Sequence, residues 1–143
     1  WGMKDITLKI TGKQCYESHE EEQMEFVTDG KLYVRGSAIY IVYDETDVSG
    51  MAGYKTTLKL SGDSLKMRRI GSGGPQTELY FEKGRRISSS YDTPYGPLEL
   101  EVLTSSVINR LDAADFRGNV DIEYHVSLSG MAESKNRLTI DVQ

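Results

Sequence analysis

The chain has 143 residues, of which 38% are hydrophobic and 27% charged, a balance typical of folded globular proteins and not of disordered chains. This length fits one domain, so we predict a single domain over residues 1–143. The net charge of −5 disfavours a large cationic face, and we expect no nucleic-acid partner, although a small local basic patch stays compatible with that charge.

The single cysteine, Cys15, excludes an intrachain disulfide and favours a reducing, cytoplasmic location. No apolar run approaches the ~20 residues that cross a bilayer, and no basic stretch followed by an apolar segment marks the N-terminus, so we expect no membrane partner. Met3 is a candidate native start behind Trp1 and Gly2, and Trp1 therefore receives no functional weight.

Alternation of apolar and polar residues with period two, the pattern of half-buried strands, recurs along the whole chain. In the first half, turn residues and an acidic run at 17–22 separate the alternating segments. These segments predict strands at residues 6–10, 24–28, 31–35, 38–44, 54–60 and 64–70. The short connection at 61–63 is typical of a hairpin.

The second half continues the pattern at spacings of roughly ten residues. It predicts strands at residues 76–83, 86–91, 98–102, 119–128 and 136–142. Only residues 105–115 break the rhythm, because Val107, Ile108 and Leu111 are spaced like one or two helical turns. A short helix and a strand with a wide loop both fit this segment.

Strands with one apolar face and no helices to cover it must pack on a second sheet or curl into a barrel, which also removes exposed edges. Short turns between successive strands favour an up-and-down arrangement over a Greek-key sandwich, which periodicity does not exclude. We therefore predict an all-β fold, an antiparallel meander β-barrel of about 8–10 strands.

Strand parity predicts which polar side chains face the barrel interior. The apolar residues of each strand assign five polar residues to that side: Tyr43, Thr56, Arg69, Tyr91 and Tyr124. A guanidinium among hydroxyls is suited to bind a carboxylate or phosphate in an otherwise apolar pocket, so these five are candidate ligand-binding residues. The alternative is structural, with Arg69 capping a barrel end and the tyrosines filling the interior.

Other reactive side chains point to surface positions. His19 lies in the acidic run with no second histidine nearby, so a solvated turn explains it better than a metal site. His125 is expected to face outward, Cys15 has no partner in sequence, and Glu99 and Glu101 fit surface charge. We predict no catalytic residue, no cofactor and no metal, and an enzyme is the least favoured class.

Four segments carry a family resemblance: MRRIG at 67–71, FEKG at 81–84, YDTPYG at 91–96 and GNVDIEY at 118–124. They resemble the YwiB-like family of uncharacterised bacterial proteins, and the likeness extends over residues 6–142. The most specific part is the turn formed by Thr93, Pro94 and Gly96, where proline presets a bend and glycine permits an unusual backbone angle. The resemblance implies a cytoplasmic, calycin-type barrel similar to the lipocalins, a domain of unknown function, and no catalytic residues.

Two functional hypotheses follow, in addition to the disfavoured enzyme. The first is a barrel that binds a small apolar or anionic molecule, with an interior cavity lined by Arg69 and at least one of the inward tyrosines. The second is a structural or protein-interaction module with a filled core and no ligand, for which a homodimer is the simplest assembly.

Overall fold

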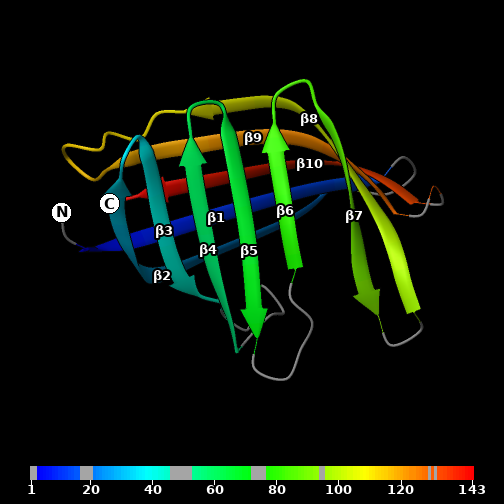
Figure 1. Cartoon of the computed structure of the whole chain (residues 1–143), viewed down its shortest axis with the longest axis horizontal. Helices are drawn as coiled ribbons and strands as arrows, with labels where there is room; N and C mark the ends of the chain where they lie inside the picture. The colour runs from blue at the N-terminus through cyan, green and yellow to red at the C-terminus, as the bar shows by residue number, and fades with distance from the viewer. Residues whose placement is uncertain are drawn as a thin grey trace.

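The computed structural model describes residues 3–16, 21–45, 53–71, 77–93, 96–128, 130 and 132–143. These residues form ten antiparallel strands in a single sheet, which curls into a nearly closed barrel (Figure 1). The strands are β1 (Lys4–Tyr16), β2 (Glu22–Arg35), β3 (Ala38–Asp44), β4 (Tyr54–Ser61), β5 (Ser64–Gly71), β6 (Thr77–Glu82), β7 (Arg86–Thr93), β8 (Gly96–Asn109), β9 (Gly118–Leu128) and β10 (Ala132–Val142).

The strand order is β6-β5-β4-β3-β2-β1-β10-β9-β8-β7. Each strand pairs with its neighbour in sequence, except that β6 and β7 are the two sheet edges and the first and last strands pair with each other. The prediction of an all-β antiparallel meander barrel is therefore confirmed, including the number of strands.

The barrel approaches closure at one point, the turn between β6 and β7. The amide of Gly84 donates to the carbonyl of Thr104 on β8 at 2.8 Å, and the amide of Thr104 donates to the carbonyl of Arg85 at 3.3 Å. A register shift between Thr104 and Ser106 marks a β-bulge at the same place in β8. Because a bulge bends its strand and increases the local twist, it helps to curl β8 towards this turn.

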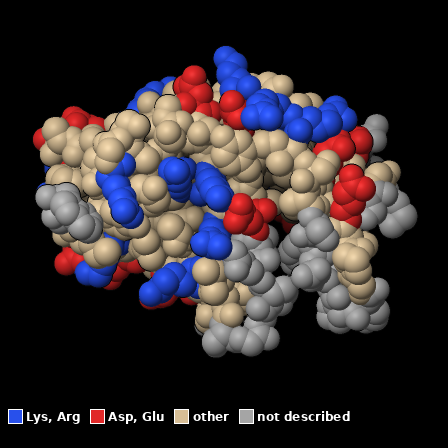
Figure 2. All heavy atoms as spheres, in the orientation of Figure 1, with Lys and Arg blue, Asp and Glu red and all other residues tan. Residues whose placement is uncertain are grey.

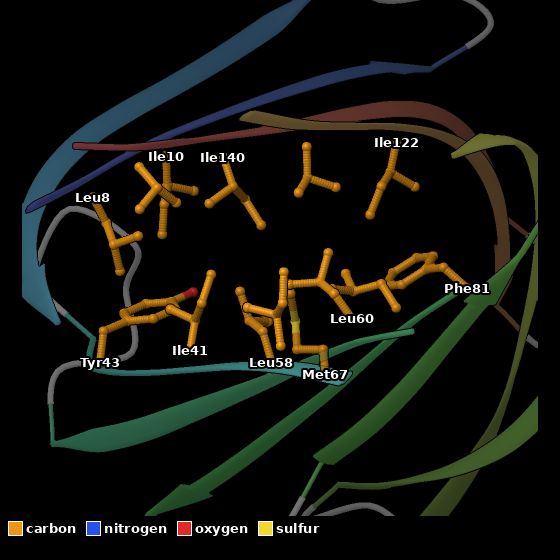
Figure 3. Packing of buried hydrophobic residues seen from close by; sticks show 14 of the residues in the cluster. Leu8, Ile10, Ile41, Tyr43, Leu58, Leu60, Met67, Phe81, Ile122 and Ile140 are labelled. Carbon is orange, nitrogen blue, oxygen red and sulfur yellow. The ribbon is translucent and has the colours of Figure 1, made fainter. Parts of the chain in front are cut away.

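Apolar side chains from β1 to β6 and from β8 to β10 point into the barrel (Figure 3). Leu8, Ile41, Leu58 and Ile122, from β1, β3, β4 and β9, are completely buried. Burying an aliphatic side chain of this size stabilises the fold by roughly 1.5–3 kcal/mol, so this interior is the main source of stability. The inward parity predicted from the sequence is confirmed for β3, β4 and β5.

Two segments differ from the sequence-based expectation. The strands expected at 24–28 and 31–35 are one continuous strand, β2, because Gly30 is not a turn residue. A Cβ at Gly30 would lie 2.9 Å from both Leu8 Cδ1 and the Val42 carbonyl oxygen, so glycine permits a close approach inside the sheet.

The second difference concerns the strand expected at 98–102, which extends through the bulge to Asn109. Of the two interpretations left open for 105–115, the strand followed by a loop is therefore correct. A turn bridged between Asp112 and Arg117 completes that loop. Within the described residues, no helix is long and apolar enough to cross a membrane.

Candidate functional site

Three of the residues predicted to face inward lie in one row across neighbouring strands. Tyr43 on β3 pairs in register with Thr56 on β4, which in turn pairs with Arg69 on β5. Thr56 and Tyr43 are buried, whereas the side chain of Arg69 is 24% exposed to solvent. Strand pairing therefore brings together a phenol, a hydroxyl and a guanidinium that lie far apart in sequence.

The centre of this row is a carboxylate that the sequence analysis missed. The side chain of Glu45 is completely buried, and its Oε1 accepts hydrogen bonds from Thr56 Oγ1 at 2.5 Å and from Arg69 Nε at 3.3 Å. Its second oxygen, Oε2, is buried with no hydrogen-bond partner. The expected strand ended at Asp44, but extending the parity of Ile41 and Tyr43 by one step would have placed Glu45 inside.

The electrostatics of the two inward tyrosines reflect this pair of charges. Burial, and then the negative charge of Glu45, raise the pKa of the Tyr43 hydroxyl, while Arg69 acts in the opposite direction. Burial also raises the pKa of Tyr124, and again the positive charge of Arg69 opposes the shift. Both phenols are therefore neutral hydrogen-bonding groups at physiological pH.

Arg69 and Tyr124 line a cavity of about 350 Å³. Tyr124 on β9 packs against Phe81 on β6, with ring centroids 4.7 Å apart and planes tilted by 59°. The remaining apolar part of the lining comes from Met24, Met67, Leu79 and Leu138. The exposed residues Glu22 and Gln23 are also part of the lining, so the cavity opens to solvent.

The structure therefore brings two of the five candidate ligand-binding residues to the cavity. Tyr43 and Thr56 do not line this cavity. Thr56 is connected to it through hydrogen bonds, because Thr56 donates to Glu45 and Arg69, which lines the cavity, donates to the same carboxylate. The side chain of Tyr91 lies outside the described residues. Asn136, a buried amide that the sequence analysis did not single out, also lines the cavity.

A larger hollow of about 580 Å³ lies over β1, β2 and β3, and the candidate residue Tyr43 is part of its lining. Its lining includes outward-facing charged residues, and a Lys31–Asp5 ion pair of 2.8 Å crosses between β2 and β1 there. The lining of this hollow carries charges of both signs and is more polar than apolar, whereas ligand pockets are mostly apolar with a few polar groups. The interior cavity fits that description better.

The remaining predicted positions are mostly at the surface. His125 is exposed, as parity predicted, and Cys15 is exposed as well. Gly96 has a φ of +113°, which agrees with the unusual backbone angle expected there, and it pairs with Thr93 at the end of the β7–β8 hairpin. Pro94 lies outside the described residues, as does His19. No group of three potential metal ligands occurs within the described part of the chain.

The geometry therefore defines the class of this protein. It is a β-barrel with a partly filled interior, an ion pair inside the barrel and a small cavity. The chain matches the family model described as "Domain of unknown function (DUF1934)" over residues 8–140, and it belongs to that family. It is 31% identical over 137 residues to the "Uncharacterized beta-barrel protein YwiB" of Bacillus subtilis (strain 168), covering 94% of this chain and 90% of that protein.

The fold is also similar to a solved structure, described as the crystal structure of ywiB protein from Bacillus subtilis. The TM-score is 0.82 at 26% sequence identity, over 99% of this chain and 92% of that chain. The resemblance found in the sequence is therefore confirmed, and the relatives are themselves of unknown function.

Proposed function

We propose that this protein binds a small molecule with one anionic group and a compact apolar body in the barrel interior. The observation that carries the proposal is the cavity in which Arg69 and Tyr124 lie beside an apolar side formed by Met24, Met67, Leu79, Phe81 and Leu138. Its volume of about 350 Å³ is at the lower end of the range of ligand pockets, roughly 300–1,000 Å³. Lipocalin-like barrels provide an analogy for such a use of the fold, and the analogy alone carries no function.

The arrangement of Arg69 supports an anionic group in the ligand. Its Nε donates a hydrogen bond to Glu45 Oε1, and within the described residues its terminal Nη atoms donate to no acceptor. An arginine held along one edge keeps the rest of its rigid fork of donors available, which is the geometry that recognises carboxylates. Glu45 balances the charge of Arg69, and Asp121 balances that of Arg137, while Lys13 and Glu22 in the lining carry opposite charges. A singly charged group therefore fits this site better than a polyphosphate.

Native mass spectrometry of protein purified from its own cells, compared with the same sample after denaturation, tests the proposal. We expect an extra mass that is lost on denaturation and is absent from Leu138→Trp, which fills the cavity from β10. The matched control, Val27→Trp, adds the same side chain on the exposed outer face of β2 and should retain the mass.

A defined probe makes the test independent of what copurifies. 1-Anilinonaphthalene-8-sulfonate carries one anionic group on an aromatic body, and its fluorescence should rise with the wild type and with Val27→Trp. The rise should be lost in Leu138→Trp and strongly reduced in Glu45→Gln/Arg69→Met, which removes both charges together. Bare protein from its own cells, together with equal probe binding by all four proteins, would exclude this cavity as the binding site.

A second candidate function, a protein-interaction module that forms a homodimer, is supported by the two edge strands. Within the described residues no ladder joins β6 to β7, so each presents backbone groups that another strand can pair with. Light scattering during gel filtration distinguishes the candidates, because a dimer mass without bound ligand would favour the module. A monomer that binds the sulfonate probe would favour the binding barrel.

A further inference from the structure

A row of aromatic and basic side chains crosses the outer face of the barrel from β2 to β6. One residue from each strand takes part, in direct register: Tyr33, Tyr40, Lys59, Lys66 and Tyr80. We call these five residues the basic–aromatic row. Four strand spacings of about 4.8 Å give the row a length of roughly 19 Å.

The side chains of the row contact one another along its length. Tyr33 and Tyr40 stack with ring centroids 4.9 Å apart and planes within 1° of parallel. The ammonium of Lys59 lies 5.9 Å from the centroid of the Tyr40 ring. Because β6 is a sheet edge, no ladder neighbour within the described residues covers the far side of Tyr80. The row therefore ends at the edge of the sheet, on the half-buried ring of Tyr80.

Basic residues are in excess around the row. Lys55, Lys59, Lys66 and Arg68 share this face, on which the carboxylate of Glu78 lies 3.2 Å from Lys66 and 3.9 Å from Arg68. Within the described residues, Lys55 and Lys59 form no ion pair. Figure 2 shows the resulting concentration of basic side chains over β3 to β5. Since the chain as a whole carries a net charge of −5, its charges are unevenly distributed.

We propose that this face binds single-stranded nucleic acid, with Lys59 and Lys66 at the phosphates and a base stacked on the half-buried ring of Tyr80 at the sheet edge. Proteins that bind single strands without sequence preference combine a positive surface with aromatic side chains, and they occupy four or more nucleotides per site. An acidic peptide needs the cations only, whereas the bases of a single strand also stack on aromatic rings, so the tyrosines favour nucleic acid over a peptide. The proposal revises the expectation drawn from net charge, which averages over both faces.

The test is the fluorescence anisotropy of labelled 20-nucleotide oligo(dT) and oligo(U) at several salt concentrations. Single strands give a slope of log affinity against log salt of about −0.7 per phosphate contact, so three to four contacts predict a slope of roughly −2 to −3. Lys59→Glu/Lys66→Glu should weaken binding at least tenfold. The control Arg117→Glu/Lys135→Glu makes the same charge change at exposed sites on other parts of the barrel and should bind as the wild type does.

A substitution of Tyr80 distinguishes binding of nucleic acid from binding of other polyanions. Tyr80→Ala should weaken oligonucleotide binding several-fold without changing the salt slope, because stacking releases no counterions. Absence of binding at 20 mM salt, or equal losses in the two double variants, would overturn the proposal. Equal affinity for phosphatidylglycerol vesicles, with no effect of Tyr80→Ala, would also overturn it in favour of a general anionic surface. The cavity variant Leu138→Trp should bind oligonucleotides normally, so the two proposals fail separately.

Discussion

The ion pair between Glu45 and Arg69 is costly unless its members stay together. Taking charges out of water costs several kcal/mol per ion, and only good geometry with further hydrogen bonds offsets that cost. Glu45 receives such bonds on Oε1 from Thr56 and Arg69, but Oε2 has none. Apolar residues of similar volume are often as stabilising as such a pair, so stability alone does not explain its presence.

Separating the pair should therefore cost more than removing it. Arg69→Met leaves the carboxylate of Glu45 buried without its counter-ion, and we expect the free energy of unfolding to fall by about 3 kcal/mol. Glu45→Gln/Arg69→Met should recover at least half of that loss. Urea denaturation of the two variants and the wild type measures both values. If the double variant is as unstable as the single one, packing by the arginine stem is what matters.

Two buried threonines differ in the use of their hydroxyls. Thr56 donates to Glu45, whereas Thr104 Oγ1, at the closure point of the barrel, is buried without a partner. Valine has nearly the same shape, so Thr104→Val removes an unsatisfied group and should raise the free energy of unfolding by about 1 kcal/mol. Thr56→Val is the matched substitution and should lower it by a similar amount. Thermal or urea unfolding gives the sign, and a loss of stability in Thr104→Val would indicate a hydrogen bond to ordered water.

At the scale of elements, an ion pair links the outer faces of β9 and β10. Arg137 donates from Nε to Asp121 Oδ1 at 2.9 Å, and Nη2 donates to the other carboxylate oxygen. These hydrogen bonds hold the pKa of Asp121 below its usual value near 3.8. A lowered folded-state pKa gives stabilisation that is complete above the unfolded pKa and is lost as the pH falls through the folded one.

The resulting expectation is a loss of stability in acid. Because Arg137 is half exposed, solvent screens this pair, and we expect its contribution at neutral pH to be small. The difference in free energy of unfolding between the wild type and Asp121→Asn should be constant from pH 5 to 8 and shrink below pH 4. Urea titrations at these values measure it. A difference that persists at pH 2 would assign the effect to packing and not to charge.

The turn between β8 and β9 depends on a glycine. Gly118 has a φ of +132°, and a Cβ there would lie 2.1 Å from the carbonyl oxygen of Arg110. We expect Gly118→Ala to lower the free energy of unfolding by at least 2 kcal/mol, since it adds a backbone clash to an unfavourable conformation. The control Gly12→Ala meets only Met24 Cε at 3.7 Å and should be nearly neutral. Equal effects in the two variants would mean that the turn adjusts without cost.

Sequence patterns predicted elements better than their ends, for reasons visible at particular residues. Period two located most strands because one face of each is buried, and the same parity placed Tyr43, Thr56 and Arg69 inside. Gly30 was mistaken for a strand boundary. The sequence alone does not distinguish a glycine that permits close approach inside a sheet from a glycine in a turn. Which polar residues meet depends on register across strands, and a single sequence does not contain that register.

The whole molecule is a sheet whose ends, β6 and β7, come together only near their connecting turn (Figure 1). In contrast, β1 and β10 pair over nine residues from Leu8 to Tyr16, and each is also paired on its other side, with β2 and β9. Stability is not uniform across a structure, and strands with a neighbour on one side open more easily than strands paired on both. We therefore expect the barrel to open between β6 and β7.

Amide hydrogen exchange measures this unevenness directly. We expect β6 and β7 to exchange faster than β3, which is comparably short but is paired on both sides by β2 and β4. Protection should be greatest in β1 and β10. A bound ligand that contacts Phe81 and Leu79 on β6 should slow exchange in that strand more than in β3, because it stabilises the closed arrangement. Equal protection of β6, β7 and β3 without ligand would show that another chain pairs with these edges in solution, as the homodimer would require.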